Sequence, residues 1–124
     1  MTAHSKTSGI KLRVVLADGV GIGSGKIALL QGIEDTGSIS AAGRSLAMSY
    51  KRAWYLIEAL NDHFAGPLVE TAKGGKAGGG AQLTPLGKEV LIAYREMEKL
   101  TEAAVSPILR KLRRKVKRAR PAER

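Results

Sequence analysis

Cysteine is absent from this chain of 124 residues, and aromatic residues are few, with one Trp, one Phe and three Tyr. The missing cysteines exclude disulfides, thiolate zinc sites and cysteine nucleophiles. No apolar run reaches about 18 residues, and the polar stretch Met1 to Gly9 is not followed by a hydrophobic segment. We therefore expect neither a membrane span nor a signal peptide, and we expect the protein to be cytoplasmic.

Residues typical of catalytic or metal sites are also scarce. The two histidines, His4 and His63, lie far apart in the sequence, and the carboxylates occur singly. The glycine-rich segment from Gly19 to Lys26 has Val20 and Ile27 where a phosphate-binding loop requires Gly and Ser or Thr. We predict no enzyme, no metal and no cofactor, and we interpret this segment as a connection.

Positive charge is abundant but unevenly distributed. The net charge is +10, and residues 110–124 carry nine Lys or Arg against one Glu, whereas the preceding residues carry twelve basic and ten acidic ones. The basic segment 110–124 is either a solvated extension or a segment that binds nucleic-acid phosphates without sequence specificity. A specific nucleic-acid surface has to be sought in local patterns.

Hydrophobic periodicity and helix caps predict the elements of the first half. Alternation over residues 10–16 predicts one strand. Ser24 is expected to cap a helix that ends at Gly37, Ser38 a short helix, and Ser49 a longer one. The last two helices, joined by a tight turn, form a helix-turn-helix.

A hairpin and a long helix are predicted to follow. Strands at 68–73 and 82–84 flank a glycine-rich loop, for which a flexible linker is the alternative. Thr84 and Pro85 begin a long helix with an apolar stripe, and we expect a break at Ser106-Pro107.

The predicted fold is mainly α with a small β-wing (α+β), a winged helix-turn-helix with a long C-terminal dimerisation helix. We expect a disordered N-terminus at 1–9, the DNA-binding domain with its dimerisation helix at 10–105, and a basic C-terminal helix or tail at 106–124.

Candidate DNA-reading residues lie in the first turns of the helix that Ser49 caps. Lys51 and Arg52 can donate to guanine or phosphate, and Tyr50 and Tyr55 offer hydroxyls. A solvated amphipathic helix is the alternative, and we expect Trp54 to pack against the core.

Candidate backbone contacts come from the preceding helix and the wing. Arg44 and the amides at Ser38 and Ser40 can face phosphates. A loop with little side-chain bulk can approach DNA closely while its lysines supply charge. The residues concerned are Lys73, Gly74, Gly75 and Lys76.

Three segments together resemble one protein family. They are Gly37 to Arg44, Ser49 to Trp54 and the wing Lys73 to Ala81, with Leu83-Thr84 and Gly87 after it. In these, the chain resembles the N-terminal domain of the ModE family of molybdate-responsive transcriptional regulators, from about residue 10 to 99. The stretch GSISAA is shared with the broader LysR-type regulators.

The resemblance implies a homodimeric regulator that binds a palindromic operator, often near molybdate-uptake or molybdoenzyme genes. It implies base reading by residues 49–52, backbone contacts by Arg44, Lys73 and Lys76, and a dimer made by the early strand and the first and last long helices. Because no strand-rich segment follows Leu109, we expect no molybdate-binding module, and any molybdate sensing would need a separate molybdate-binding protein as partner.

Two further functions are left open. One is an architectural protein that coats DNA regardless of sequence through its tail and wing. The other is a direct oxyanion (molybdate) sensor that uses the wing amides as an anion-binding nest.

Overall fold

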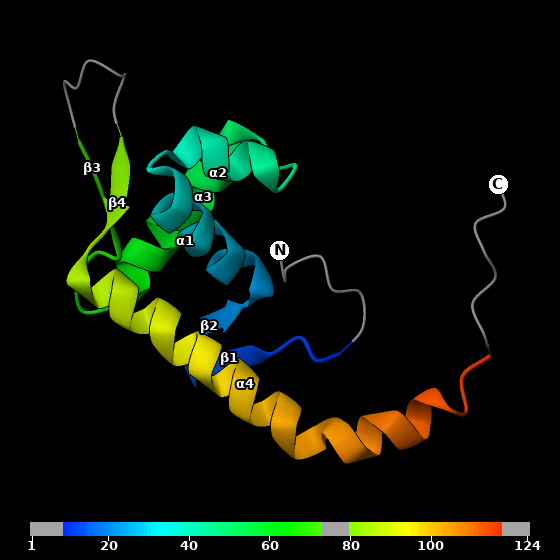
Figure 1. The fold of residues 1–124 in the computed structure, drawn as a ribbon. Helices are drawn as coiled ribbons and strands as arrows, with labels where there is room; N and C mark the ends of the chain where they lie inside the picture. Colours follow the sequence, from blue (N-terminus) through cyan, green and yellow to red (C-terminus); the bar gives the residue numbers. More distant parts are fainter. Residues whose placement is uncertain (1–8, 73–79, 118–124) are drawn as a thin grey trace, which may run out of the picture.

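The computed structural model describes residues 9–72 and 80–117, in which four helices and two hairpins follow one another (Figure 1). The predicted fold class is confirmed, since the chain is mostly helical with a small wing. The elements are β1 (Arg13–Ala17), β2 (Val20–Gly23), α1 (Ser24–Thr36), α2 (Ile39–Ser45), α3 (Tyr50–His63), β3 (Val69–Thr71), β4 (Ala81–Leu83) and α4 (Pro85–Arg113).

The N-terminal region is a hairpin, and here the sequence prediction was wrong. β1 pairs antiparallel with β2, with Val14 opposite Ile22, so the segment interpreted as a connection is a strand. Glycines alternate with Val20 and Ile22 in β2, and because glycine is uncommon in strands the segment was interpreted as a connection. Gly19, with φ 73°, makes the turn.

The cap of α1 also differs from the prediction. Ser24 is the first helical residue, and the N-cap is Gly23, which makes no side-chain hydrogen bond. The helix end was predicted correctly, because Gly37 adopts a left-handed φ of 72° and its N–H donates to the carbonyl of Ile33 at 2.8 Å.

The core lies where α1, α2 and α3 meet the wing and the first half of α4. Its largest fully buried side chains are Ile27, Leu29, Leu30, Ile33, Ile57, Leu60, Leu68 and Tyr94. Small residues let these elements approach closely. A Cβ on Gly32 would lie 2.8 Å from the Cβ of Ala42, and one on Gly87 would collide with the carbonyl oxygen of Leu68.

Tyr94 joins the start of the chain to α4. Its side chain is buried, and its hydroxyl donates to the carbonyl of Leu12 at 2.7 Å. Burial raises the pKa of Tyr94 above its usual value of 10.0, and the Glu98 carboxylate acts in the same direction.

The long helix α4 runs through Ser106 and Pro107 without interruption, so the predicted break is wrong. Pro107 removes one backbone donor, but the carbonyl four residues earlier belongs to Ala103, which is exposed and can be hydrated. A proline inside a helix bends it, and Figure 1 shows that the axis of α4 changes direction in its C-terminal half, beyond the other elements.

Candidate nucleic-acid interface

The helix-turn-helix comprises α2, α3 and the turn between them. Both predicted caps are present: the Ser38 hydroxyl accepts from the amide of Ala41, and the Ser49 hydroxyl accepts from the amide of Arg52, each at 3.0 Å. Ala47 makes the turn with a φ of 57°, a left-handed conformation that is rare outside glycine.

The first turn of α3 presents its side chains to solvent. Ala53, Ile57 and Leu60 are buried, and Lys51 and Arg52 are exposed. Tyr50 and Tyr55 expose 58% and 63% of their surface, which is unusual for large aromatic side chains and leaves their hydroxyls available. Ser49 is exposed beside them.

The candidates of the α2 segment lie at both ends of this helix. Arg44 is exposed in the last turn, and Ser38 and Ser40 are half-buried at the start, with their hydroxyl oxygens 3.4 Å apart. Within the described part of the chain, Arg44, Lys51 and Arg52 form no ion pair with a carboxylate. Their charges are therefore not neutralised by those residues.

The wing is held against the helices by specific hydrogen bonds. The Asn61 side-chain oxygen on α3 accepts from the amides of Leu68 and Val69 at 2.8 and 3.2 Å, and its nitrogen donates to the Val69 carbonyl at 3.2 Å. On the other strand, the Ala81 amide donates to the Gly37 carbonyl at 2.9 Å. The base of the wing is therefore fixed to both α3 and the α1–α2 corner.

The predicted hairpin is confirmed: β3 is shorter than the predicted strand at 68–73, and β4 has the predicted length but begins one residue earlier. Val69 lies opposite Leu83 and Thr71 opposite Ala81. The wing-tip candidates Lys73, Gly74, Gly75 and Lys76 lie outside the described residues.

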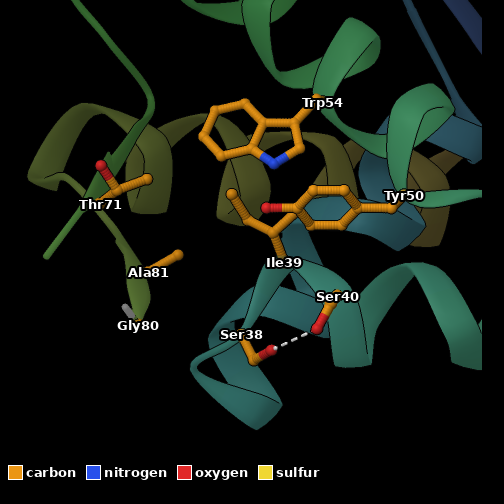
Figure 2. Close-up of a pocket in the computed structure, with 8 residues that line it drawn as sticks. All are labelled: Ser38, Ile39, Ser40, Tyr50, Trp54, Thr71, Gly80 and Ala81. Atoms are coloured by element: carbon orange, nitrogen blue, oxygen red, sulfur yellow. Dashed lines mark hydrogen bonds between the residues drawn. The ribbon is translucent and has the colours of Figure 1, made fainter. Parts of the chain in front are cut away.

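A recess of about 140 Å³ lies where α2, α3 and the wing meet (Figure 2). The indole of Trp54 packs edge-on against the Tyr50 ring, with centroids 6.2 Å apart and ring planes at 79°. The complete lining is Ser38, Ile39, Ser40, Tyr50, Trp54, Thr71, Gly80 and Ala81.

Five of these lining residues were not among the sequence candidates for DNA contact, and two of the five, Trp54 and Thr71, carry polar side-chain groups. The predicted packing role of Trp54 is confirmed, since it is half-buried against the core, yet it also lines the recess. Trp54 therefore both packs against the core and contributes to the wall of the recess. Thr71 carried no signal in the sequence, because only strand pairing brings it opposite α3.

In residues 9–72 and 80–117, no group of three or more His, Asp or Glu side chains is placed to hold a metal ion. No helix in these ranges is both long and apolar enough to cross a membrane.

Comparison with known families identifies the domain. Residues 25–88 match the family model of the bacterial regulatory helix-turn-helix proteins of the lysR family, a range that contains α1 except for its first residue, together with α2, α3 and the wing. The chain belongs to this family. The helix-turn-helix that the sequence predicted is therefore confirmed, and α3 occupies the position of its second helix.

Curated relatives of this lysR-family chain include named molybdenum proteins. It is 50% identical over 80 residues to the molybdenum-pterin-binding protein MopB of Rhodobacter capsulatus, a match that covers 64% of this chain and 30% of that protein. It is 46% identical over 72 residues to the molybdenum transport protein ModE of Herbaspirillum seropedicae, covering 58% and 27%.

A third relative carries a regulatory name. The DNA-binding transcriptional dual regulator ModE of Escherichia coli (strain K12) is 39% identical over 79 residues, covering 64% of this chain and 30% of that protein. The chain thus spans only about 30% of the length of these relatives. The similarity nevertheless agrees with the ModE resemblance noted in the sequence.

Proposed function

We propose that this protein is a sequence-specific, DNA-binding transcriptional regulator connected with molybdenum metabolism, working in the cytoplasm. The observation that carries the proposal is the exposed first turn of α3, where Lys51 and Arg52 lie without carboxylate partners among the described residues. The helix carrying them is N-capped, packed on its other face and placed beside a wing. The names of the relatives supply the link to molybdenum.

In this function α3 enters the major groove, and its N-terminal residues meet base edges. Lys51 and Arg52 donate to guanine or to phosphate, and Ser49, Tyr50 and Tyr55 contribute hydroxyls and ring surface. The backbone is contacted by the side chain of Arg44, by Ser38 and Ser40, and by the wing residues Lys73, Gly74, Gly75 and Lys76.

Regulators of this type bind palindromes as dimers, and α4 carries a surface suited to pairing. The stripe that begins with buried Leu91 and Tyr94 continues along the same side of the helix to Ile108 and Leu112, each 59% exposed. Val15 and Leu16 on β1 are exposed as well. We propose that a second copy covers these apolar side chains, and that a separate molybdate-binding protein supplies any molybdate response.

Selection of bound sites from a random duplex library, at near-physiological salt, tests the proposal. We expect an enriched palindrome whose half-sites lie about one helical turn or more apart, because a symmetric dimer presents two copies of α3. A pool without any enriched sequence would contradict sequence-specific regulation.

The basic end of α4 favours one alternative. Residues 110–117 include six Lys or Arg side chains, all exposed. Such a segment binds phosphates of any sequence, as an architectural DNA-coating protein requires. The ratio of specific to non-specific affinity separates the two functions, since it falls towards one for the architectural protein.

A further inference from the structure

We propose that the recess between α2, α3 and the wing binds a single phosphodiester group of the DNA backbone through uncharged donors. This inference rests on the proposed DNA-binding function. The recess measures about 140 Å³. A recess of this size is large enough to admit a small polar group such as one phosphate.

The lining is rich in groups that donate hydrogen bonds. The Trp54 indole nitrogen is a donor only, and among the described residues it has no acceptor. It is also not sealed from solvent, because no fully buried side-chain nitrogen or oxygen of these residues lacks a partner. Figure 2 shows this nitrogen on the ring edge nearest Tyr50 and Ile39, with the Tyr50 hydroxyl directed into the same space.

Hydroxyl groups from two other elements add further hydrogen-bond donors to the recess. Ser40 on α2 and Thr71 on β3 line the recess from opposite sides, and Ile39 and Ala81 contribute its apolar surface. Phosphate oxygens only accept hydrogen bonds, so they match a donor-rich lining. The planes of the Tyr50 and Trp54 rings meet at 79°, so the two rings do not form a parallel slot that would hold a base between them.

The position of the recess fits a backbone strand that passes from α3 to the wing. Tyr50 and Trp54 lie in the first two turns of α3, next to exposed Lys51 and Arg52, while Thr71 and Gly80 lie on the wing side. None of the lining side chains is charged. The contact therefore positions the DNA without adding to the number of phosphates neutralised by Lys and Arg.

The test uses the full chain and the duplex obtained by site selection, with a single uncharged methylphosphonate placed at each backbone position in turn. The variant Trp54→Phe with Thr71→Val removes two donors and retains the ring and the branched shape. We expect it to bind the unmodified duplex about tenfold more weakly, as expected for lost hydrogen bonds to a charged group. Thermal unfolding confirms that the variant is folded.

One backbone position should distinguish the recess from other contacts. There, the methylphosphonate weakens the wild-type protein but has no further effect on the double variant, while all other positions retain their effects and act as controls. The salt dependence should be unchanged in the double variant, whereas Lys51→Ala lowers the slope by about one if Lys51 contacts a phosphate. If no position loses its effect, the recess proposal is overturned while selective DNA binding stands.

Fluorescence provides a second readout with the unmutated protein, because Trp54 is the sole tryptophan of the chain. Its emission should change when the selected duplex binds, and change much less with the methylphosphonate at the identified position. Equal changes would overturn the proposal. A saturable response to inorganic phosphate alone would assign the recess to a free oxyanion instead of the backbone, and failure to select any sequence would overturn the proposed function itself.

Discussion

The two halves of α4 carry the same apolar stripe, but the stripe is buried in the first half and exposed in the second. On a helical wheel, where each residue advances by about 100°, the apolar residues of both halves fall within one arc about 100° wide. They are Val90, Leu91 and Tyr94 in the first half and Ile108, Leu109 and Leu112 in the second. Leu91 and Tyr94 are buried against the domain, but Ile108 and Leu112 are 59% exposed. Periodicity thus determines which face of a helix is apolar, and not what covers it.

The contacts of the first half explain why it is fixed. Thr84 caps the helix by accepting from the Gly87 amide at 2.9 Å, and its own hydroxyl donates to the Pro67 carbonyl at 2.7 Å. Gly87 lies directly against the backbone of Leu68. The second half extends away from the other elements (Figure 1), so none of these elements buries its stripe.

The largest effect on stability is expected from a substitution that disrupts the packing of the first half of α4 against the domain. Gly87→Ala places a methyl group against the Leu68 carbonyl, which is backbone and cannot rotate away. We expect a loss of about 3 kcal/mol in the free energy of unfolding, measured by urea denaturation. Gly25→Ala in α1 is the matched control, since nothing lies within 4 Å of its added Cβ. Equal effects at both positions would contradict the close approach.

The next prediction concerns the second half. The double variant Ile108→Asp with Leu112→Asp should change the unfolding free energy of the monomer by no more than about 0.5 kcal/mol relative to the wild type, because both side chains are exposed. Dimer formation should weaken by about 2 kcal/mol or more, since burying the charges is unfavourable. Sedimentation equilibrium across protein concentrations measures the association. An unchanged dimer would show that this stripe is not the interface.

A smaller effect is expected at Tyr94. Tyr94→Phe removes the hydrogen bond to the Leu12 carbonyl and should cost about 1 kcal/mol of unfolding free energy. Because the pKa of Tyr94 is raised in the folded state, its contribution is complete below pH 10.0 and is lost as pH rises through the higher folded value. Wild-type stability should therefore fall above pH 10.0 more steeply than that of the variant, as denaturation at several pH values would reveal.

The smallest effect on folding is expected from Pro107→Ala. The substitution restores a backbone donor in an exposed stretch of α4 and should straighten and stabilise the second half. Circular dichroism should show more helix, while the unfolding free energy of the domain changes by no more than about 0.5 kcal/mol. A large gain in domain stability would mean that the two halves fold as one unit.

Local rules predicted much of this fold. Ser38, Ser49 and Thr84 cap their helices as their side chains suggested, because N-capping depends on a few neighbouring residues. The exposed face of α3 also followed from periodicity. The β1–β2 hairpin was missed because the glycines of β2 suggested a connection. The continuous α4 was missed because proline usually ends a helix, whereas here the carbonyl that loses its donor belongs to exposed Ala103.

The candidate interface was predicted in part for the same reason. Lys51 and Arg52 were found from their place in one helix, whereas the role of Thr71 in the recess depends on the pairing of β3 with β4 and on the Asn61 hydrogen bonds that hold β3 to α3. Contacts between residues distant in the chain have no local signature.

By itself, the sequence determined the helix-turn-helix, its caps and the exposed cations on α3, because these follow from side-chain periodicity and hydrogen bonds within a few residues. Only the tertiary structure decided which half of the α4 stripe is buried, and that Trp54, Tyr50 and Thr71 enclose one recess with Ser40. Both depend on how packed elements meet, which is governed by close approach at residues such as Gly32 and Gly87.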